Sequence, residues 1–297
     1  MSQKKLSIYF WLVISIISWG SSFVAVKIGL DGLNPYELAS YRFTVASIAL
    51  IPIALLSKFK FPKWNDFKLI LALAIFGVYA YHISLNYATL NFSPNSVSFI
   101  SNSSPIFTTI FAIIFFNEKV KLLGWIGLIL SMIGVYAITI SGATIEMSTD
   151  LVALLLIPIF WGAFFILQKP LLGKLKPLEI MSYSIWIGTI LFLLTSHGFI
   201  FKLDEIPKTT HMAVIYLGIF PTVIAYLSWS IVLSRITVSR ASSFSYLVPI
   251  VTIIVSIFLI NEKPSLSLII GGIFVLLGVY FVNASEKKHR SQSKRVM

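Results

Sequence analysis

The sequence predicts an all-α integral membrane protein whose ten transmembrane helices form two inverted five-helix repeats. The first reason is composition: 57% of the 297 residues are apolar and only 11% are charged, unlike a soluble domain. The second is a series of uncharged runs long enough to cross a bilayer. The third is a residue pattern of the first half that returns in the second. We therefore divide the chain into a first repeat (residues 1–145), a second repeat (146–284) and a basic tail (285–297).

Nine uncharged runs predict where the helices lie. They cover residues 6–26, 43–57, 69–117, 122–145, 151–168, 180–201, 209–234, 241–261 and 264–285. The run 43–57 reaches spanning length only when it begins near Leu38 and includes Arg42. The run 69–117 must hold two helices, with a turn at residues 91–95, where Asn, Ser and Pro favour a reversal of the chain. Nine runs, one of them divided, give ten helices.

The positive charges predict the orientation. When both termini are placed in the cytoplasm, most of the 23 Lys and Arg residues fall on the cytoplasmic side, as the positive-inside rule requires. We therefore expect a multi-pass protein of a bacterial-type inner (plasma) membrane with a disordered, cytoplasmic tail. The basic residues lie in short loops and in the tail, which favours membrane topology over nucleic-acid binding.

The repeat is clearest where residues 93–119 return as residues 237–263. Each copy is an apolar run with a central proline, and each ends in Asn-Glu-Lys. Matching pairs include Pro105 with Pro249, Glu118 with Glu262, Trp19 with Trp161, and Gly134 with Gly278. The repeat covers five helices, and because five is odd, the second copy must cross the membrane in the opposite sense. Inverted repeats around a midplane site are the architecture of alternating-access transporters.

Each copy also carries a polar stripe, because steps of three and four residues put its members on one helix face. The stripes are Ser98, Ser101, Asn102, Pro105 and Thr108 in the first copy, and Ser242, Ser245, Tyr246, Pro249 and Thr252 in the second. A membrane helix that lines a wet cavity needs such a face. The alternative is that these hydroxyls only join helices. Two matching stripes favour the cavity.

The third helix carries Tyr79, His82 and Asn86 on one predicted face. The repeat matches His82 with Tyr226 and Asn86 with Ser230, so both halves keep polar groups at this depth. A buried histidine is either a hydrogen-bonded structural residue or a functional one, here a substrate contact or a proton-linked switch.

Aromatic residues extend this candidate site. Most membrane tryptophans belong to interfacial belts, but Trp19 and Trp161 lie deep in their runs, which makes that interpretation weaker for this pair. The predicted substrate-binding set is Trp19, Tyr79, His82, Asn86, Ser101, Asn102, Trp161, Tyr183, Trp186, Tyr226, Trp229, Ser245 and Tyr246. Arg42, near the outer face, either has a structural role, in which it could snorkel to the interface, or meets a substrate carboxylate near the outer mouth; we favour the structural role. The predicted structural or gating set is Arg42, Pro105, Glu118, Pro249 and Glu262.

The order, spacing and duplication of these residues resemble the drug/metabolite transporter superfamily, specifically its ten-helix EamA-type carriers. The resemblance is carried by the early Trp-Gly with Phe23, Arg42 after Pro35-x-Glu37, the two central prolines, the glutamates that follow them and the later glycines. It implies small-metabolite transport, often export, through a central cavity bounded by the first, third and fourth helices of each repeat. Arg42 departs from the duplication, because its match is Ser184.

The sequence thus predicts a secondary transporter that moves a small organic metabolite, such as an amino acid or a similar amphipathic compound, by export or exchange. The alternative is a membrane-embedded enzyme acting on a lipid-linked substrate, which would need a catalytic set that we do not find, so we expect no enzyme. The chain has no cysteine, and no metal-ligand spacing or phosphate-binding glycine loop occurs. We expect no cofactor, metal, nucleotide or nucleic acid, and partners limited to a small-molecule substrate and the lipid bilayer, with the protein as a monomer.

Overall fold

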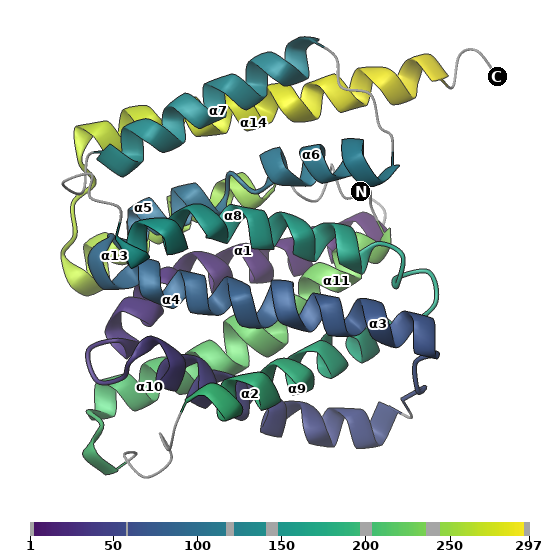
Figure 1. Cartoon of the computed structure of the whole chain (residues 1–297), viewed down its shortest axis with the longest axis vertical. Helices are drawn as coiled ribbons and strands as arrows, with labels where there is room; N and C mark the ends of the chain where they lie inside the picture. Colours follow the sequence, from purple (N-terminus) through teal and green to yellow (C-terminus); the bar gives the residue numbers. More distant parts are fainter. Residues whose placement is uncertain are drawn as a thin grey trace.

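The computed structural model describes residues 3–57, 59–116, 122–140, 148–196, 204–235 and 244–293, which form helices and short connections without strands (Figure 1). The first repeat consists of α1 (Gln3–Gly29), α2 (Pro35–Ser57), α3 (Trp64–Ala72) with η1 (Leu73–Ala80) and α4 (Tyr81–Asn91), α5 (Pro94–Ser101) with α6 (Pro105–Phe116), and α7 (Leu122–Ile140). The second repeat consists of α8 (Thr149–Gln168), α9 (Pro177–Thr195), α10 (Lys208–Leu217) with η3 (Gly218–Ile224) and α11 (Ala225–Arg235), η4 (Ser245–Leu247) with α13 (Val248–Ile260), and α14 (Leu266–Ser293).

These elements confirm the predicted fold class. Seven continuous helical stretches are long and apolar enough to cross a bilayer, and three shorter apolar helices lie at 122–138, 248–260 and 266–278. The predicted turn at 91–95 is also confirmed, because α4 ends at Asn91 and Ser93 caps α5 by accepting a hydrogen bond from the Ser96 amide. The expected disordered tail is wrong up to Ser293, since α14 continues that far. Its Glu, Lys and Arg residues are good helix formers.

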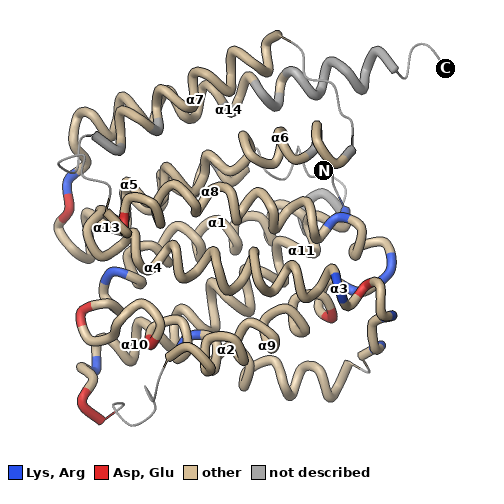
Figure 2. The backbone as a smooth tube through the Cα atoms, viewed as in Figure 1, with Lys and Arg blue, Asp and Glu red and all other residues tan. Residues whose placement is uncertain are grey.

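The exterior and the charge distribution fit a lipid environment. Large apolar side chains such as Leu56, Phe61 and Phe258 are at least 80% exposed, which water would penalise and lipid accepts. The acidic and basic residues gather mostly at the two ends of the helices (Figure 2). α1 begins and α14 ends toward the same end of the molecule (Figure 1).

Matching residues of the two repeats touch each other, which shows that the halves are related by a two-fold axis. The Ser47 hydroxyl lies 2.7 Å from that of Thr189, its match in the second repeat. The Ser131 hydroxyl donates to the carbonyl oxygen of its match, Val275, over 3.3 Å. Trp19 and Trp161, also a matched pair, have ring centroids 5.4 Å apart.

The pairing of α7 with α14 shows that the repeats are inverted. A β-carbon added at Gly134 would lie 2.5 Å from the Gly271 carbonyl oxygen, and one at Gly278 would meet the Gly127 carbonyl oxygen. Residue numbers rise along one helix as they fall along the other, so these matched helices run antiparallel. The small residues allow the two backbones to approach closely.

Matched interruptions divide the helices nearest the centre. Two π-helical segments, η1 and η3, occupy equivalent positions, and Pro221 in η3 matches Gly77 in η1. Near the predicted prolines, α5 ends in a turn at 102–104 before Pro105, and η4 leads into α13 at Val248. Breaks of this kind are stable inside a membrane protein only where protein or a cavity covers the backbone.

Contacts between segments hold both ends of the bundle. At the end where α1 begins, the Lys174 ammonium lies 2.6 Å from the Asp66 carboxylate. At the opposite end, the Asn95 side-chain amide donates to Glu262 over 2.9 Å, and Lys27 donates to the Thr89 carbonyl oxygen over 3.1 Å. Glu118, the predicted match of Glu262, lies outside the described residues.

Candidate functional site

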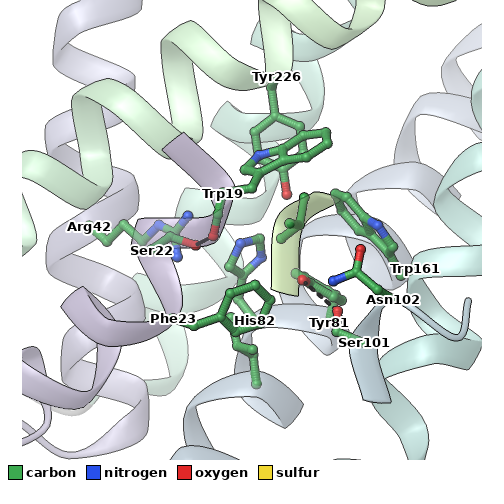
Figure 3. A pocket seen from close by; sticks show the side chains of 12 residues that line it. Trp19, Ser22, Phe23, Arg42, Tyr81, His82, Ser101, Asn102, Trp161 and Tyr226 are labelled. Carbon is green, nitrogen blue, oxygen red and sulfur yellow. Dashed lines mark hydrogen bonds between the residues drawn. The ribbon is translucent and has the colours of Figure 1, made fainter. Parts of the chain in front are cut away.

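A cavity lies at the centre of the bundle, where helices of both repeats meet. Its lining comes from α1, α2, α4, the end of α5, α8, α11 and α13, and comprises Trp19, Ser22, Phe23, Arg42, Tyr81, His82, Leu85, Ser101, Asn102, Trp161, Tyr226 and Val248 (Figure 3). These are the first, third and fourth helices of each repeat, with Arg42 added from the second helix. The position agrees with what the sequence resemblance implies.

Aromatic rings form most of the wall. The ring centroids of Trp19 and Trp161 lie 5.4 Å apart, and each lies 5.9 Å from that of Tyr226. Tyr81 stacks on Trp161 at 4.5 Å. The Trp19 indole nitrogen is already used, because it donates to the Pro221 carbonyl oxygen over 3.2 Å. The wall therefore offers mainly ring faces, which suit an apolar, aromatic or cationic part of a solute.

His82 has a fixed orientation in the cavity. Its Nδ1 lies 2.7 Å from the Val78 carbonyl oxygen, and because a carbonyl only accepts, Nδ1 carries the hydrogen. In the neutral ring, Nε2 is then an acceptor. The ring lies between Tyr81 and Phe43, with centroid distances of 4.8 and 4.7 Å.

Some residues of the polar stripe of α5 line the cavity, and others join neighbouring helices. Ser101 and Asn102 line the cavity, and the Ser101 hydroxyl lies 3.3 Å from that of Tyr81. In contrast, the Ser98 hydroxyl lies 2.9 Å from that of Thr252, which donates to the Gly20 carbonyl oxygen. Both interpretations of the stripe thus apply, each to different residues. The side chains of Ser242 and Tyr246 lie outside the described part of the structure.

Arg42 is buried in the cavity wall, so the expected snorkelling is wrong, whereas the structural role that we favoured stays a prediction. The residue is 4% exposed, and its Nε donates to the Thr222 hydroxyl over 2.8 Å. Nη1 has no hydrogen-bond partner among the described residues. The side chain turns inward because α2 packs against η3, which presents Thr222. No acidic residue is among the described side chains that line the cavity.

The cavity is contracted in this structure. Its volume is about 20 Å³, which is enough for one water molecule but not for an organic solute. The helices must therefore separate before such a solute enters.

Four of the predicted substrate-binding residues lie away from the cavity. Tyr79 packs against Phe192, with ring centroids 5.0 Å apart. Asn86 donates to the Pro35 carbonyl oxygen over 2.8 Å and so holds the start of α2. Tyr183 and Trp186 pack around Phe59, near the end where α1 begins.

Three further predicted residues have different outcomes. Trp229 is fully buried one layer behind the wall, with its ring centroid 5.0 Å from that of Trp19. Ser245 is buried in η4 and does not line the cavity. The side chain of Tyr246 is not described. The structure thus brings together Trp19, His82, Ser101, Asn102, Trp161 and Tyr226 from the predicted set.

Sequence reasoning missed several lining residues. Ser22 lies three residues after Trp19, on the same face of α1, and this spacing was a usable signal. Tyr81 was missed although it lies in α4 directly before His82 and four residues before Leu85. Tyr79, which was chosen instead, lies in the π-helical η1. Leu85 and Val248 are apolar residues on apolar helices, and nothing in the sequence distinguishes them.

The chain matches the EamA-like transporter family over residues 6–140 and 148–284, one match for each repeat. It belongs to that family. It is 28% identical to a probable terminal-alkyne amino-acid exporter of Streptantibioticus cattleyicolor, over 94% of each chain. It is 24% identical to an S-adenosylmethionine uptake transporter of Rickettsia bellii, over 95% of each chain. A solved crystal structure that is 17% identical covers 93% of this chain and 97% of its own, with a TM-score of 0.66, and supports the fold.

The EamA-like chain is accordingly a membrane transporter of small organic metabolites. The family identifies the class of protein, and the cavity is where both halves of this chain bring polar and aromatic side chains together.

Proposed function

We propose that this EamA-like transporter moves an amino acid or a similar small amphipathic compound by alternating access, with the central cavity as the solute site. The observation that carries the proposal is that the cavity lies between the inverted repeats, with matched pairs such as Trp19 and Trp161 in its wall. A site on the axis between inverted halves is equally reachable from either side when the halves rock.

The contracted cavity and the contacts at the two ends support a cycle between two access states. The Lys174–Asp66 ion pair holds one end, and the Asn95–Glu262 hydrogen bond holds the other. Alternating access requires one set of contacts to break while the other persists. In this structure the central cavity itself is too small for an organic solute.

The name of the amino-acid exporter supports an amino-acid-type solute and export. The uptake transporter, of similar length and overall match, shows that direction differs among related chains. We propose export or exchange down the solute gradient as the mode of this protein. An enzymatic reaction on a lipid-linked substrate is disfavoured, since these relatives are named as transporters.

The orientation has its own test. We propose that both termini are cytoplasmic, so that Glu118 faces the cytoplasm and Glu262 the outside. Because the chain has no cysteine, Glu118→Cys and Glu262→Cys each provide a single thiol. An impermeant thiol reagent added to intact cells should label only the variant at 262, and inverted vesicles should give the reverse. Labelling of both variants from one side would contradict opposite orientations of the two positions.

Transport itself is tested with purified protein in liposomes. Vesicles loaded with one radiolabelled amino acid at a time should release label faster than protein-free vesicles, for at least one amino acid. The same compounds should raise the melting temperature of the detergent-solubilised protein, because a ligand that binds the folded state stabilises it. Trp161→Ala, which removes a central part of the wall, should abolish both effects. Release from vesicles that is the same with and without protein, for every amino acid, would refute this solute class.

A further inference from the structure

Arg42 has a buried cationic group whose guanidinium carbon lies 5.6 Å from the Phe43 ring centroid, but no acidic residue is among the described side chains that line the cavity with it. Its Nε is held by Thr222, its Nη1 has no hydrogen-bond partner among the described residues, and the side chain lines the cavity (Figure 3). We propose that Arg42 is the anion-binding residue of the cavity, and that the transported solute carries a carboxylate bound by its guanidinium group. This inference rests on the proposed function, because it assigns a substrate class to the same cavity.

The energetics favour an anion at this position. A charged group inside a membrane protein is costly unless it is paired and hydrogen-bonded. The ion pair described elsewhere, Lys174 with Asp66, lies at one end of the bundle. Thr222 contributes one neutral hydroxyl, whose own hydrogen is donated to the Leu217 carbonyl oxygen. The remaining N–H donors of the guanidinium group are therefore left for water or a solute.

The chemistry of the wall selects a carboxylate with an amphipathic remainder. A planar guanidinium group matches the two oxygens of a carboxylate. A phosphate dianion would leave one charge unpaired, because Arg42 is the single Lys or Arg among the described residues that line the cavity. In its neutral form, His82 has an acceptor at Nε2, and the ring faces attract cations. These groups suit the ammonium group and side chain of an amino acid.

The anion site is present in one repeat only, and this asymmetry fixes the orientation of the bound solute. The match of Arg42 is Ser184, whose hydroxyl donates to the Ile180 carbonyl oxygen in its own helix. The match of Thr222 is Val78, which has no hydroxyl to hold a guanidinium group. The carboxylate should therefore point toward α2 and η3 rather than lie on the two-fold axis.

The proposal also predicts the stability of the ligand-free protein. If Arg42 served only to hold helices together, Arg42→Gln would lower the melting temperature. If Arg42 instead serves to bind an anion, its charge is unpaired in the ligand-free protein. Arg42→Gln should then leave the melting temperature unchanged or raise it, because an unpaired buried charge is removed. Arg42→Lys keeps the charge but not the planar fork, and should bind carboxylates more weakly than the parent.

The experiment compares matched acids and amides on the parent, Arg42→Gln, Arg42→Lys and the control Lys27→Gln. Lys27 is also a cation on a membrane helix, but it donates to backbone carbonyls at one end of the bundle and does not line the cavity. The probes are leucine, phenylalanine and methionine with their carboxamides, and benzoate with benzamide at millimolar concentration. The readouts are the melting temperature and the efflux rate from liposomes.

We expect the acids to raise the melting temperature of the parent and of Lys27→Gln, and both proteins to transport them. The amides should bind at least tenfold more weakly, since a charge-assisted contact is lost. In Arg42→Gln this preference should disappear. Equal binding of acids and amides by the parent, or an unchanged preference in Arg42→Gln, would overturn the inference even if transport is observed. If no amino acid is transported but benzoate protects the parent and not Arg42→Gln, the anion site stands and the proposed solute class fails. If no acid protects the parent, the anion site is refuted.

Discussion

The two halves of the cavity share a backbone plan but differ in chemistry. Trp19 and Trp161 are the same residue type at equivalent positions of the two repeats, and both line the cavity. His82 and Tyr226 are also equivalent and both line it, but one is an imidazole and the other a phenol. Arg42 has no cationic equivalent. The shared plan supports two access states related by symmetry, and the differing side chains determine what binds between them.

The comparison separates residues that maintain the framework from those that select a solute. Framework residues should respond alike in both halves, because their surroundings are duplicated. Solute-selecting residues should respond differently, because their chemistry is not. The following predictions test this separation, beginning with the largest expected effect.

Gly134→Ala and Gly278→Ala should destabilise the protein strongly and to a similar degree. The added methyl group would meet backbone atoms of the partner helix at either position, so α7 and α14 must move apart. Overpacking of this kind costs about 1–3 kcal/mol, measured as a loss of thermal stability in detergent. Gly173→Ala is the matched control, because no atom lies within 4 Å of the added carbon. A large loss at one position with none at its match would contradict the symmetry of the framework.

Tyr226→Phe should reduce transport without reducing stability. The structure shows no hydrogen bond for the Tyr226 hydroxyl to any described residue, and the ring lines the cavity with its oxygen directed inward (Figure 3). Loss of one hydrogen bond to a solute corresponds to about 1 kcal/mol, or roughly fivefold in apparent affinity. Tyr216→Phe is the control, because that hydroxyl contacts Ser21 and the residue does not line the cavity. Unchanged apparent affinity in Tyr226→Phe would show that this hydroxyl does not contact the solute.

The smallest expected effect is a weak pH dependence that requires His82. It is the one histidine among the described residues of the cavity wall, and no described carboxylate joins it there. Arg42, Tyr81 and Tyr226 are residue types that titrate well above neutrality. We expect efflux to change by about twofold or less between pH 6 and 8, and to become independent of pH in His82→Gln. His211→Gln, which alters a histidine bound to Tyr41 outside the cavity, should keep the parent profile. A steep response that survives in His82→Gln would place proton coupling elsewhere.

The sequence predicted the fold in detail because a duplicated pattern carries more information than any single motif. The separation of Trp19 from Trp161 and of Gly134 from Gly278 identified five-helix units, and the odd number of helices required inversion. The places where helices end along the chain were also predictable. The turn at 91–95 follows from its Asn, Ser and Pro residues, and α4 ends there.

The candidate site was harder to predict, because lining a cavity depends on the rotation of each helix. His82 and Asn102 were placed on the correct face by regular spacing. Tyr79 and Asn86 were not: Tyr79 lies in η1, whose wider π-helical turn changes the rotation per residue, and Asn86 in α4 donates to the Pro35 carbonyl oxygen instead. Arg42 was misplaced for another reason: its depth along α2 suggested snorkelling, whereas packing of α2 on η3 supplies Thr222 as a partner inside the protein. No sequence period reveals such a contact.

The π-helical segments have a consequence for motion. Each contains wide turns closed by hydrogen bonds to the fifth preceding residue, as from the Tyr81 amide to Phe76 and from the Ala225 amide to Phe220. Rewinding such a segment into regular α-helix by one residue would turn everything beyond it by about 100°. His82 and Tyr226 follow η1 and η3 almost immediately, so rewinding in either half would rotate that ring relative to the rest of the cavity wall.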